Sequence, residues 1–351
     1  MLLYLHIPYC DSKCHYCSFN SYVDRFDTRP SYMSALLRQL DFELEKFSVK
    51  TGEIETVFIG GGTPSTVDPT LYKPLFMRLQ PYLKKGAEIT VEANPNSAKK
   101  SWLQGMHKLG VNRLSLGVQS FNQTKLKALN RAHSAADAIR AIEEAYHIGF
   151  EHISLDLIYN FQGDTQELLR DDIKQAFQLP IDHISAYELT IESQTKFAHT
   201  PEVRQENEFL AFWVAEEIVK QGFEHYEISN FGNYQSLHNK GYWELKDYIG
   251  LGAGAVGFQK DRRYYPVTDI GHYIENPLNI TEELITADEL LTERIFLGLR
   301  SVIGIDRGYL TKAMQQRCEF LVQENKLIKE DQFYKNSNFF LADEIALFIL
   351  S

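Results

Sequence analysis

Residues 2–17 of the chain read LLYLHIPYCDSKCHYC and hold Cys10, Cys14 and Cys17 at a C-x3-C-x2-C spacing. The apolar run that precedes the cysteines predicts a β-strand over 2–7. The cysteines then follow in the loop after that strand. Thiolates are the soft ligands that hold iron–sulfur clusters. Three thiolates on a cube of four irons leave one iron without a protein ligand, so a small cofactor can bind that iron directly.

S-adenosylmethionine can fill such a position through its amine and carboxylate groups. An electron from the cluster then cleaves the sulfonium and releases an adenosyl radical. The alternative is a structural zinc site of the Cys3His type, with His6 or His15 as the fourth ligand. Structural zinc sites usually pair a C-x2-C with a second, distant pair of ligands. Here the fourth cysteine, Cys318, stands alone in a helical pattern and is expected to be a buried small residue.

Strand and helix patterns alternate along the first two-thirds of the chain. Apolar runs predict strands over 2–7, 55–59, 88–92, 112–118, 152–158 and 183–189. Such alternation is typical of a parallel sheet. Six repeats are too few for the usual eight-stranded closed barrel. The sequence therefore predicts an α/β fold, an open and partial (β/α)6 barrel of the TIM type.

Helices are expected over 33–47, 134–148 and 204–221. For the second of these, Ser134 is a plausible N-cap, Asp137 stands at the capping-box position, and Gly149 ends the helix.

The pattern divides the chain into three parts. Residues 1–225 form the predicted barrel core, and 226–285 form a loop-rich linking region rich in Gly, Tyr and Asn. Residues 286–351 predict a small helical or winged-helix-like C-terminal domain with a hairpin within Leu327–Leu341.

Composition excludes several classes of protein. Of the 351 residues 44% are hydrophobic, and the formal net charge is −11. An acidic chain repels phosphate backbones, so no nucleic-acid partner is expected. No apolar stretch approaches the roughly 18 residues of a transmembrane helix, and the first residues do not resemble a secretion signal. The expected location is the cytoplasm, where thiols stay reduced.

Polar residues recur at or just beyond the ends of the predicted strands. The run Gly60–Thr63 follows the second strand, and Glu92, Gln119 and Asp156 stand at or just beyond the ends of later ones. Glycine lets a backbone approach a ligand closely. In barrels, the carboxyl ends of the strands build the site, so we expect these residues to converge on one cavity. Arg131 could pair with a cofactor carboxylate; otherwise it is a solvated surface residue.

The stretch 238–243 reads HNKGYW and lies in the loop-rich region. His238, beside the aromatics Tyr242 and Trp243, could ligate or stack on a plane of the size of haem. A hydrogen-bonded structural histidine is the alternative.

Six motifs together resemble a known family over nearly the whole chain. They are YLHIPYCDSKCHYCSF, FIGGGTPS, VEANP, LSLGVQSFN, LNRAH and DLIY, in this order. The chain resembles the radical S-adenosylmethionine family of coproporphyrinogen III oxidases, and within it the haem chaperone (HemW) branch. The porphyrinogen-oxidising branch carries a fourth cysteine where this chain has Phe19, and an N-terminal extension where this chain begins in its first strand. The HNKGYW stretch matches the chaperone branch.

The resemblance implies a protein that binds haem as cargo and delivers it to respiratory haem proteins. Its cofactors would be a [4Fe–4S] cluster on Cys10, Cys14 and Cys17 and S-adenosylmethionine. The residues that the resemblance assigns to the S-adenosylmethionine site are Tyr4, Gly61, Gly62, Thr63, Glu92, Gln119, Arg131, Asp156 and Thr190. His238, with Tyr242 and Trp243, is the candidate for haem.

The resemblance further implies a homodimer and peripheral contact with the inner membrane during delivery. The branch differences make coproporphyrinogen III dehydrogenase activity the alternative function, which we do not expect. One departure concerns the loop after DLIY, where Asn160, Phe161 and Gln162 replace the family's Gly-Leu-Pro.

Overall fold

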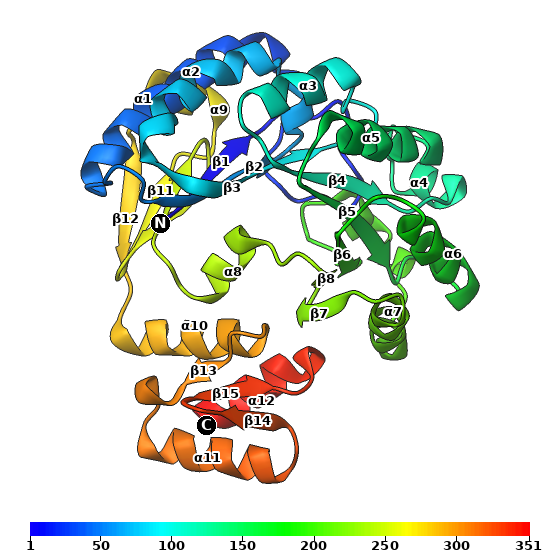
Figure 1. Ribbon diagram of the computed structural model, residues 1–351, viewed down its shortest axis with the longest axis vertical. Coiled ribbons are helices and arrows are strands. Elements are labelled where there is room, and N and C mark those ends of the chain that lie inside the picture. The colour runs from blue at the N-terminus through cyan, green and yellow to red at the C-terminus, as the bar shows by residue number, and fades with distance from the viewer.

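The computed structural model describes residues 1–351, and its main element is a twelve-stranded sheet (Figure 1). The strand order is β12-β11-β10-β9-β1-β2-β3-β4-β5-β6-β8-β7. Its parallel strands are β1 (Leu2–Ile7), β2 (Ile54–Gly61), β3 (Leu83–Ala93), β4 (Arg113–Gln119), β5 (His152–Tyr159), β6 (His183–Glu188) and β9 (Tyr248–Leu251). The sheet curves into an open arc with helices on its outer side, so the predicted partial barrel is confirmed.

Helices connect the parallel strands in the predicted alternating manner. They are α1 (Arg29–Lys46), α2 (Pro69–Leu79), α3 (Lys100–Lys108), α4 (Gln123–Ala128), α5 (Ala135–Ile148), α6 (Gln166–Phe177) and α7 (Glu208–Lys220). The capping box predicted for α5 is confirmed, because the Ser134 and Asp137 side chains each accept from the other's backbone N–H, and Gly149 ends the helix with a φ of 104°.

Two helix starts differ from the sequence prediction. Helix α1 begins at Arg29, because Pro30 suits the first turn of a helix. Helix α7 begins at Glu208 and not at 204, because the residues before it bond elsewhere. The Arg204 guanidinium donates to Glu188 Oε1 (2.9 Å), and the Gln205 amide donates to the Asn160 carbonyl (2.8 Å).

The two faces of the curved sheet differ in chemistry, because alternate residues of a strand point to opposite faces. On β4, Leu114, Leu116 and Val118 belong to the main hydrophobic core of 58 buried residues, together with residues of the outer helices. The residues between them, Arg113 and Ser115 among others, therefore face the inside of the arc. The inner face is polar, and it leads to the carboxyl ends of the strands.

The stretch 226–285, predicted as loop-rich, contains short regular elements. They are β7 (Glu224–Glu227), β8 (Asn230–Gly232), α8 (Leu237–Trp243), β9, β10 (Gly257–Gln259), β11 (Arg262–Pro266), α9 (Ile270–Glu275) and β12 (Ile280–Leu284). These elements complete both edges of the main sheet, and α8 lies on the inner side of the arc in Figure 1. Strands of three to five residues are too short to give a periodic pattern, so neighbouring strands and not local sequence fix them.

The C-terminal residues surround a hydrophobic core of their own. Its 12 buried residues run from Ile295 to Ile349. The elements are α10 (Ala287–Leu299), β13 (Ile305–Asp306), α11 (Lys312–Gln323), β14 (Leu327–Glu330), β15 (Phe333–Asn336) and α12 (Ala342–Leu350), and β14 with β15 forms the predicted hairpin. This separate core supports a domain boundary near residue 286, which we keep as a proposal. None of the helices is long and apolar enough to cross a membrane.

A buried ion pair fixes the loop in which Asn160, Phe161 and Gln162 depart from the family pattern. The Lys125 ammonium lies 2.7 Å from an Asp164 carboxylate oxygen and also donates to the Ile158 carbonyl (2.6 Å). The other carboxylate oxygen accepts from the Phe161 amide (2.9 Å). The two side chains are only 2% and 0% exposed.

We expect Lys125→Met to lower the free energy of unfolding by about 3–5 kcal/mol, because it leaves the Asp164 carboxylate buried and unpaired. Urea unfolding would measure this loss. Lys127→Met, on the exposed face of the same helix, is the matched control and should change the free energy by less than about 0.5 kcal/mol. A loss of under about 1 kcal/mol for Lys125→Met would contradict the role of the pair.

Candidate functional site

A cavity of about 490 Å³ lies at the carboxyl ends of the parallel strands. It brings together nearly all the residues that the sequence predicts for the cluster and the cofactor. These are Cys10, Cys14, Cys17, Gly61, Gly62, Thr63, Glu92, Gln119, Arg131, Asp156 and Thr190. They come from the ends of all six predicted strands and the segments after them, so the predicted convergence on one cavity is what the fold produces.

Polar donors face the sulfur atoms of the cysteine loop. The Arg131 guanidinium donates to Cys14 Sγ (3.2 Å), and the Thr63 hydroxyl donates to Cys10 Sγ (3.4 Å). Burial raises the pKa of the Cys10 thiol. A bound cation at the sulfur would oppose this rise, since a metal deprotonates the thiols that coordinate it. The donors therefore suit thiolates that carry negative charge.

Residues distant in sequence, on the side of the sheet next to β1, hold the cysteine loop in place. The Asn20 side-chain amide donates to the Thr268 carbonyl (2.7 Å) and to the Ala253 carbonyl (3.1 Å). The backbone carbonyl of Asn20 is bonded to His6 Nε2 (2.9 Å). The segment that follows the last cysteine is thus anchored to both β1 and the residues around β9 and β11.

The donor set of the loop, which has three thiols and no histidine free to join them, fits a cluster better than a single zinc ion. A tetrahedral ion needs its ligands around one point, whereas a cube binds each thiolate on a different iron. Both candidate fourth ligands are also engaged. The ring nitrogens of His6 bond Tyr4 Oη and the Asn20 carbonyl (both 2.9 Å), and those of His15 bond the Ala128 carbonyl and Lys196 Nζ (both 3.2 Å).

The glycine run forms a closely packed wall of the cavity. The Gly61 amide donates to Glu92 Oε2 (3.1 Å), and Gly61 has a φ of 111°. A Cβ atom at Gly62 would lie 2.8 Å from the Tyr9 carbonyl oxygen and 2.9 Å from that of Ile7. Only glycine fits there, so the backbone of this run can approach a ligand directly.

Two carboxyl groups and one guanidinium stand at the strand ends among the charged residues of the cavity, which also include Lys13, Glu188 and Glu192. Burial raises the pKa of Glu92 to about 8, and the neighbouring Asp156 raises it as well. Burial also raises the pKa of Asp156, to about 6, although Arg131 and Arg113 oppose the rise. The Arg131 guanidinium is fixed by Asn94 Oδ1 (2.6 Å) and by the Gly117 carbonyl. The site can accept a molecule that carries both an ammonium and a carboxylate group.

The sequence reasoning missed several residues of the cavity, among them Asn94, Ser115, Gly117 and Tyr187. Ser115 and Gly117 share the inner face of β4 with Gln119, and this alternation could have revealed them. Asn94 stands within the VEANP motif, two residues after the predicted Glu92.

Tyr4 and His238 lie outside the lining of this cavity, and the contact of Tyr4 with the cofactor stays a prediction. They line a second one of about 250 Å³ with Phe58 and Tyr242. His238 is 1% exposed, and its ring nitrogens bond Thr56 Oγ1 (2.7 Å) and Tyr242 Oη (3.0 Å). Burial lowers its pKa to about 3. Trp243 lines neither cavity, and its buried Nε1 has no hydrogen-bond partner.

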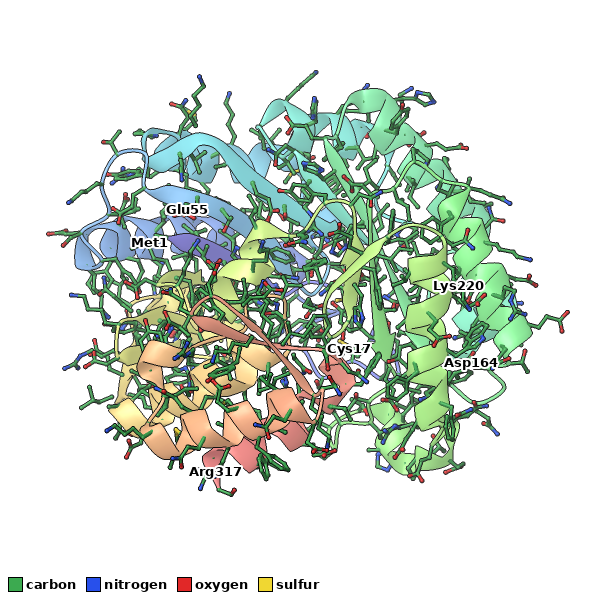
Figure 2. The ribbon with its side chains drawn as sticks, turned by 60° about the horizontal axis from the view of Figure 1, so that its bottom comes forward. Met1, Cys17, Glu55, Asp164, Lys220 and Arg317 are labelled. Atoms are coloured by element: carbon green, nitrogen blue, oxygen red, sulfur yellow. The ribbon has the colours of Figure 1, made fainter.

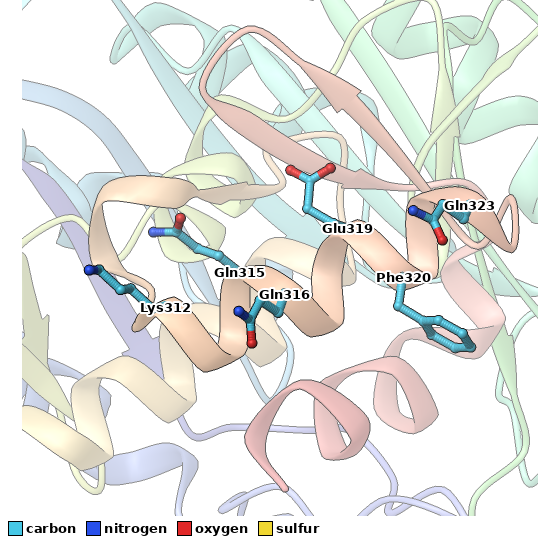
Figure 3. Close-up of a pocket in the computed structure, with 6 residues that line it drawn as sticks. All are labelled: Lys312, Gln315, Gln316, Glu319, Phe320 and Gln323. Atoms are coloured by element: carbon cyan, nitrogen blue, oxygen red, sulfur yellow. The ribbon is translucent and has the colours of Figure 1, made fainter.

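A third hollow, of about 440 Å³, runs along α11 of the C-terminal part and contains none of the predicted residues (Figure 3). Arg317 of α11 lies at the lower edge of Figure 2, whereas Cys17 lies near the centre of that view. We assign this hollow no function.

A three-cysteine loop after the first strand of an open parallel barrel, with charged residues on the following strand ends, defines the class of radical S-adenosylmethionine proteins. In agreement, the family described as the radical SAM superfamily matches residues 4–176. Membership implies a [4Fe–4S] cluster and S-adenosylmethionine. The residues present fit both groups, since three thiols border a cavity that carries the matching charges.

Comparison with known proteins narrows the class. The heme chaperone HemW of Bacillus subtilis is 36% identical over 325 aligned positions, and the match covers 87% of this chain and 84% of that protein. The heme chaperone HemW of Haemophilus influenzae is 31% identical, over 99% of this chain and 97% of that protein. The chain therefore belongs to the HemW family.

Among solved structures, the coproporphyrinogen III oxidase HemN of Escherichia coli superimposes with a TM-score of 0.82. The match covers 99% of this chain and 89% of that one, at 18% identity, and it shows a shared fold.

Cysteine substitutions test the metal centre. We expect the chain reconstituted without oxygen to bind about four irons and to be brown. Cys10→Ser should abolish this cluster, because two thiolates rarely hold one. Cys318→Ser is the matched control, since Cys318 is buried in the core of the C-terminal part and should leave the iron content unchanged. Iron analysis and the visible spectrum measure both. Stoichiometric zinc at the three thiols, with no uptake of iron, would contradict the assignment.

Proposed function

We propose that this protein is a haem chaperone, which binds haem and hands it to a respiratory haem protein. The observation that carries the proposal is the similarity along 99% of the chain to a protein named heme chaperone HemW. The cavity at the strand ends supports the retention of a cluster and cofactor site. Phe19, 64% exposed, stands where the resemblance expects the fourth cysteine of the porphyrinogen-oxidising branch, and this disfavours dehydrogenase activity.

The proposal assigns roles to the residues of the cavity. Cys10, Cys14 and Cys17 would hold the cluster, and one-electron chemistry would come from the cluster and cofactor when they are bound. Arg131 would orient a carboxylate, because its guanidinium is already fixed by three partners. Glu92 and Asp156 would face the positively charged groups of S-adenosylmethionine. Gly61, Gly62, Thr63, Gln119 and Thr190 would complete the wall.

His238 is the haem candidate of this proposal, and its position sets a condition. Its backbone amide donates to a Glu88 carboxylate oxygen (3.0 Å), as does that of Leu237 (2.9 Å). With Thr56 on the ring, three hydrogen bonds hold the start of α8 to the barrel, and Tyr242 of the same helix bonds the other ring nitrogen. The imidazole can meet a haem iron only if α8 moves away from the barrel.

The proposal extends to partners and place. The recipient would be a respiratory haem protein, and transfer would occur while the chain contacts the inner membrane from the cytoplasm. A homodimer is the expected assembly. The comparisons name no recipient.

Haem binding and transfer test the function directly. We expect the anaerobic, cluster-loaded chain to shift the Soret band of added haem and then to pass the haem to an apo-cytochrome. The Soret band of the acceptor measures the transfer. Cluster-loaded protein that binds no haem, but converts coproporphyrinogen III to protoporphyrinogen IX with S-adenosylmethionine and a reductant, would overturn the proposal in favour of the dehydrogenase.

Two substitutions, one at His238 and one at its contact with the barrel, test the haem candidate. His238→Ala should weaken haem binding by roughly tenfold or more, as expected when an axial ligand is lost. Thr56→Val should strengthen haem binding, because it removes the hydrogen bond that ties the ring to β2 of the barrel. Soret titrations measure both affinities. Unchanged binding in His238→Ala, with a lower melting temperature, would show that His238 is a structural residue only.

A further inference from the structure

Arg113 is a buried positive charge without a negative partner. It lies near the start of β4 on the inner face of the barrel and is 2% exposed. The only hydrogen bond of its side chain is a long one, from Nη1 to Thr90 Oγ1 (3.4 Å), and its Nε has no partner at all. An arginine side chain stays ionised in proteins, so the barrel interior holds an unpaired charge.

Such a charge is costly, and elsewhere the chain avoids the cost. The buried ammonium of Lys125 has the Asp164 carboxylate at 2.7 Å. Moving an ion from water into a protein interior costs several kcal/mol unless other charges compensate it. A buried and unsatisfied group therefore calls for an explanation beyond packing.

The explanation lies in the layer above Arg113. On the inner face of β4, Ser115 follows Arg113 and pairs with Glu92 of β3, while Asp156 lies on β5 beyond it. Arg113 does not line the cofactor cavity, whereas Ser115, Glu92 and Asp156 do. The guanidinium thus lies beneath the two carboxyl groups, outside contact with any bound cofactor. Its charge lowers the pKa of both groups against the opposing effect of burial.

Other charged or titratable groups also face Glu92 and Asp156. They are Tyr4 of β1, Tyr16 of the cysteine loop, Arg131 after α4, and Tyr187 of β6. The tyrosines are neutral near pH 7, because burial raises the pKa of each. Arg131 also lowers the pKa of Asp156, from the cavity rim, where its guanidinium donates to Asn94 and to the Gly117 carbonyl. Arg113 acts on both Glu92 and Asp156, and it does so from below the cavity.

We propose that Arg113 is a positioning residue that sets the charge state of Glu92 and Asp156, and with it the pH range in which the cavity accepts a cationic cofactor. This inference rests on the S-adenosylmethionine site of the proposed function and is independent of haem delivery.

The sign of the effect follows from proton linkage. A cation binds best when the carboxyl groups are ionised, so a protonated Glu92 must release its proton on binding. Affinity then rises with pH up to the pKa of the free protein and is constant above it. Removal of Arg113 raises that pKa and moves the rise to higher pH. Above the rise the variant should bind at least as tightly as wild type, because a positive charge that repels the cofactor has gone.

The experiment is a calorimetric titration of the anaerobic, cluster-loaded chain with S-adenosylmethionine, from about pH 6 to about pH 9.5. Arg113→Met should bind roughly three- to tenfold more weakly near pH 7, for a shift of up to about one pKa unit, and no more weakly than wild type at the upper end. Arg113→Lys should keep the wild-type profile, since it keeps the charge. Arg140→Met, which removes an exposed arginine on α5, should also keep it.

Two results would overturn the inference. One is an equal loss of affinity at every pH in Arg113→Met, which indicates packing. The other is a pH dependence of S-adenosylmethionine affinity that is the same in Arg113→Met as in wild type. If Arg113→Met fails to fold, Arg113→Gln, which keeps a donor for Thr90, takes its place. Titrations in two buffers of different ionisation enthalpy give a further measurement. The cofactor's own ammonium loses a proton at the iron in both proteins, so near about pH 8 Arg113→Met should release more protons on binding than wild type, and an equal release would contradict the inference.

Failure of this inference is distinguishable from failure of the proposed function. If the wild-type chain delivers haem but the pH dependence of S-adenosylmethionine binding does not shift in Arg113→Met, only the role of Arg113 is refuted. The shifted profile without haem delivery would refute the chaperone function alone.

Discussion

Parallel pairing of β1 to β6 is the constraint on which the site depends. Because all six strands run in one direction, their carboxyl ends meet at one rim of the barrel. The cysteine loop, the glycine run and the residues after the later strands are up to about 180 positions apart in sequence, yet they border one cavity. Arg131 joins two of these segments, since it donates both to Cys14 Sγ and to Asn94. A slip of one residue in any strand would turn its polar residue into the hydrophobic core.

Much of this arrangement could be predicted from sequence, because it rests on local patterns. The strands show alternating or continuous apolar residues, and the capping box at Ser134 predicts the start of α5. Motif spacing located Glu92 and Asp156 at strand ends. Contacts between distant segments could not be predicted in this way. The four-residue strand β9 owes its place to pairing with β1, and Tyr4 points to a second cavity because Phe58 and α8 pack beside it.

The HNKGYW stretch shows the same limit for a candidate ligand. Its composition is typical of a loop, yet it forms α8 because tertiary contacts stabilise the first turn. Glu88, on β3, accepts hydrogen bonds from two backbone amides there, and Ser236 caps the helix through the Asn239 amide. The same contacts bury His238. The residue that the motif marks for haem is therefore also part of the inner wall of the barrel.

The polar interior connects these two regions and explains why the barrel tolerates unpaired charge. Hydrophobic residues on the outer face of each strand provide the stability, so the inner face is free to carry groups that a core would reject. Arg113 lies between the cofactor cavity above and the Glu88–His238 contacts around it, and its charge lowers the pKa of His238 as well as those of Glu92 and Asp156. The carboxyl groups of the upper cavity and the His238 ring below thus lie in the electric field of the same guanidinium. A hydrophobic inner face could not hold this guanidinium, because burying an ion away from other polar groups is costly.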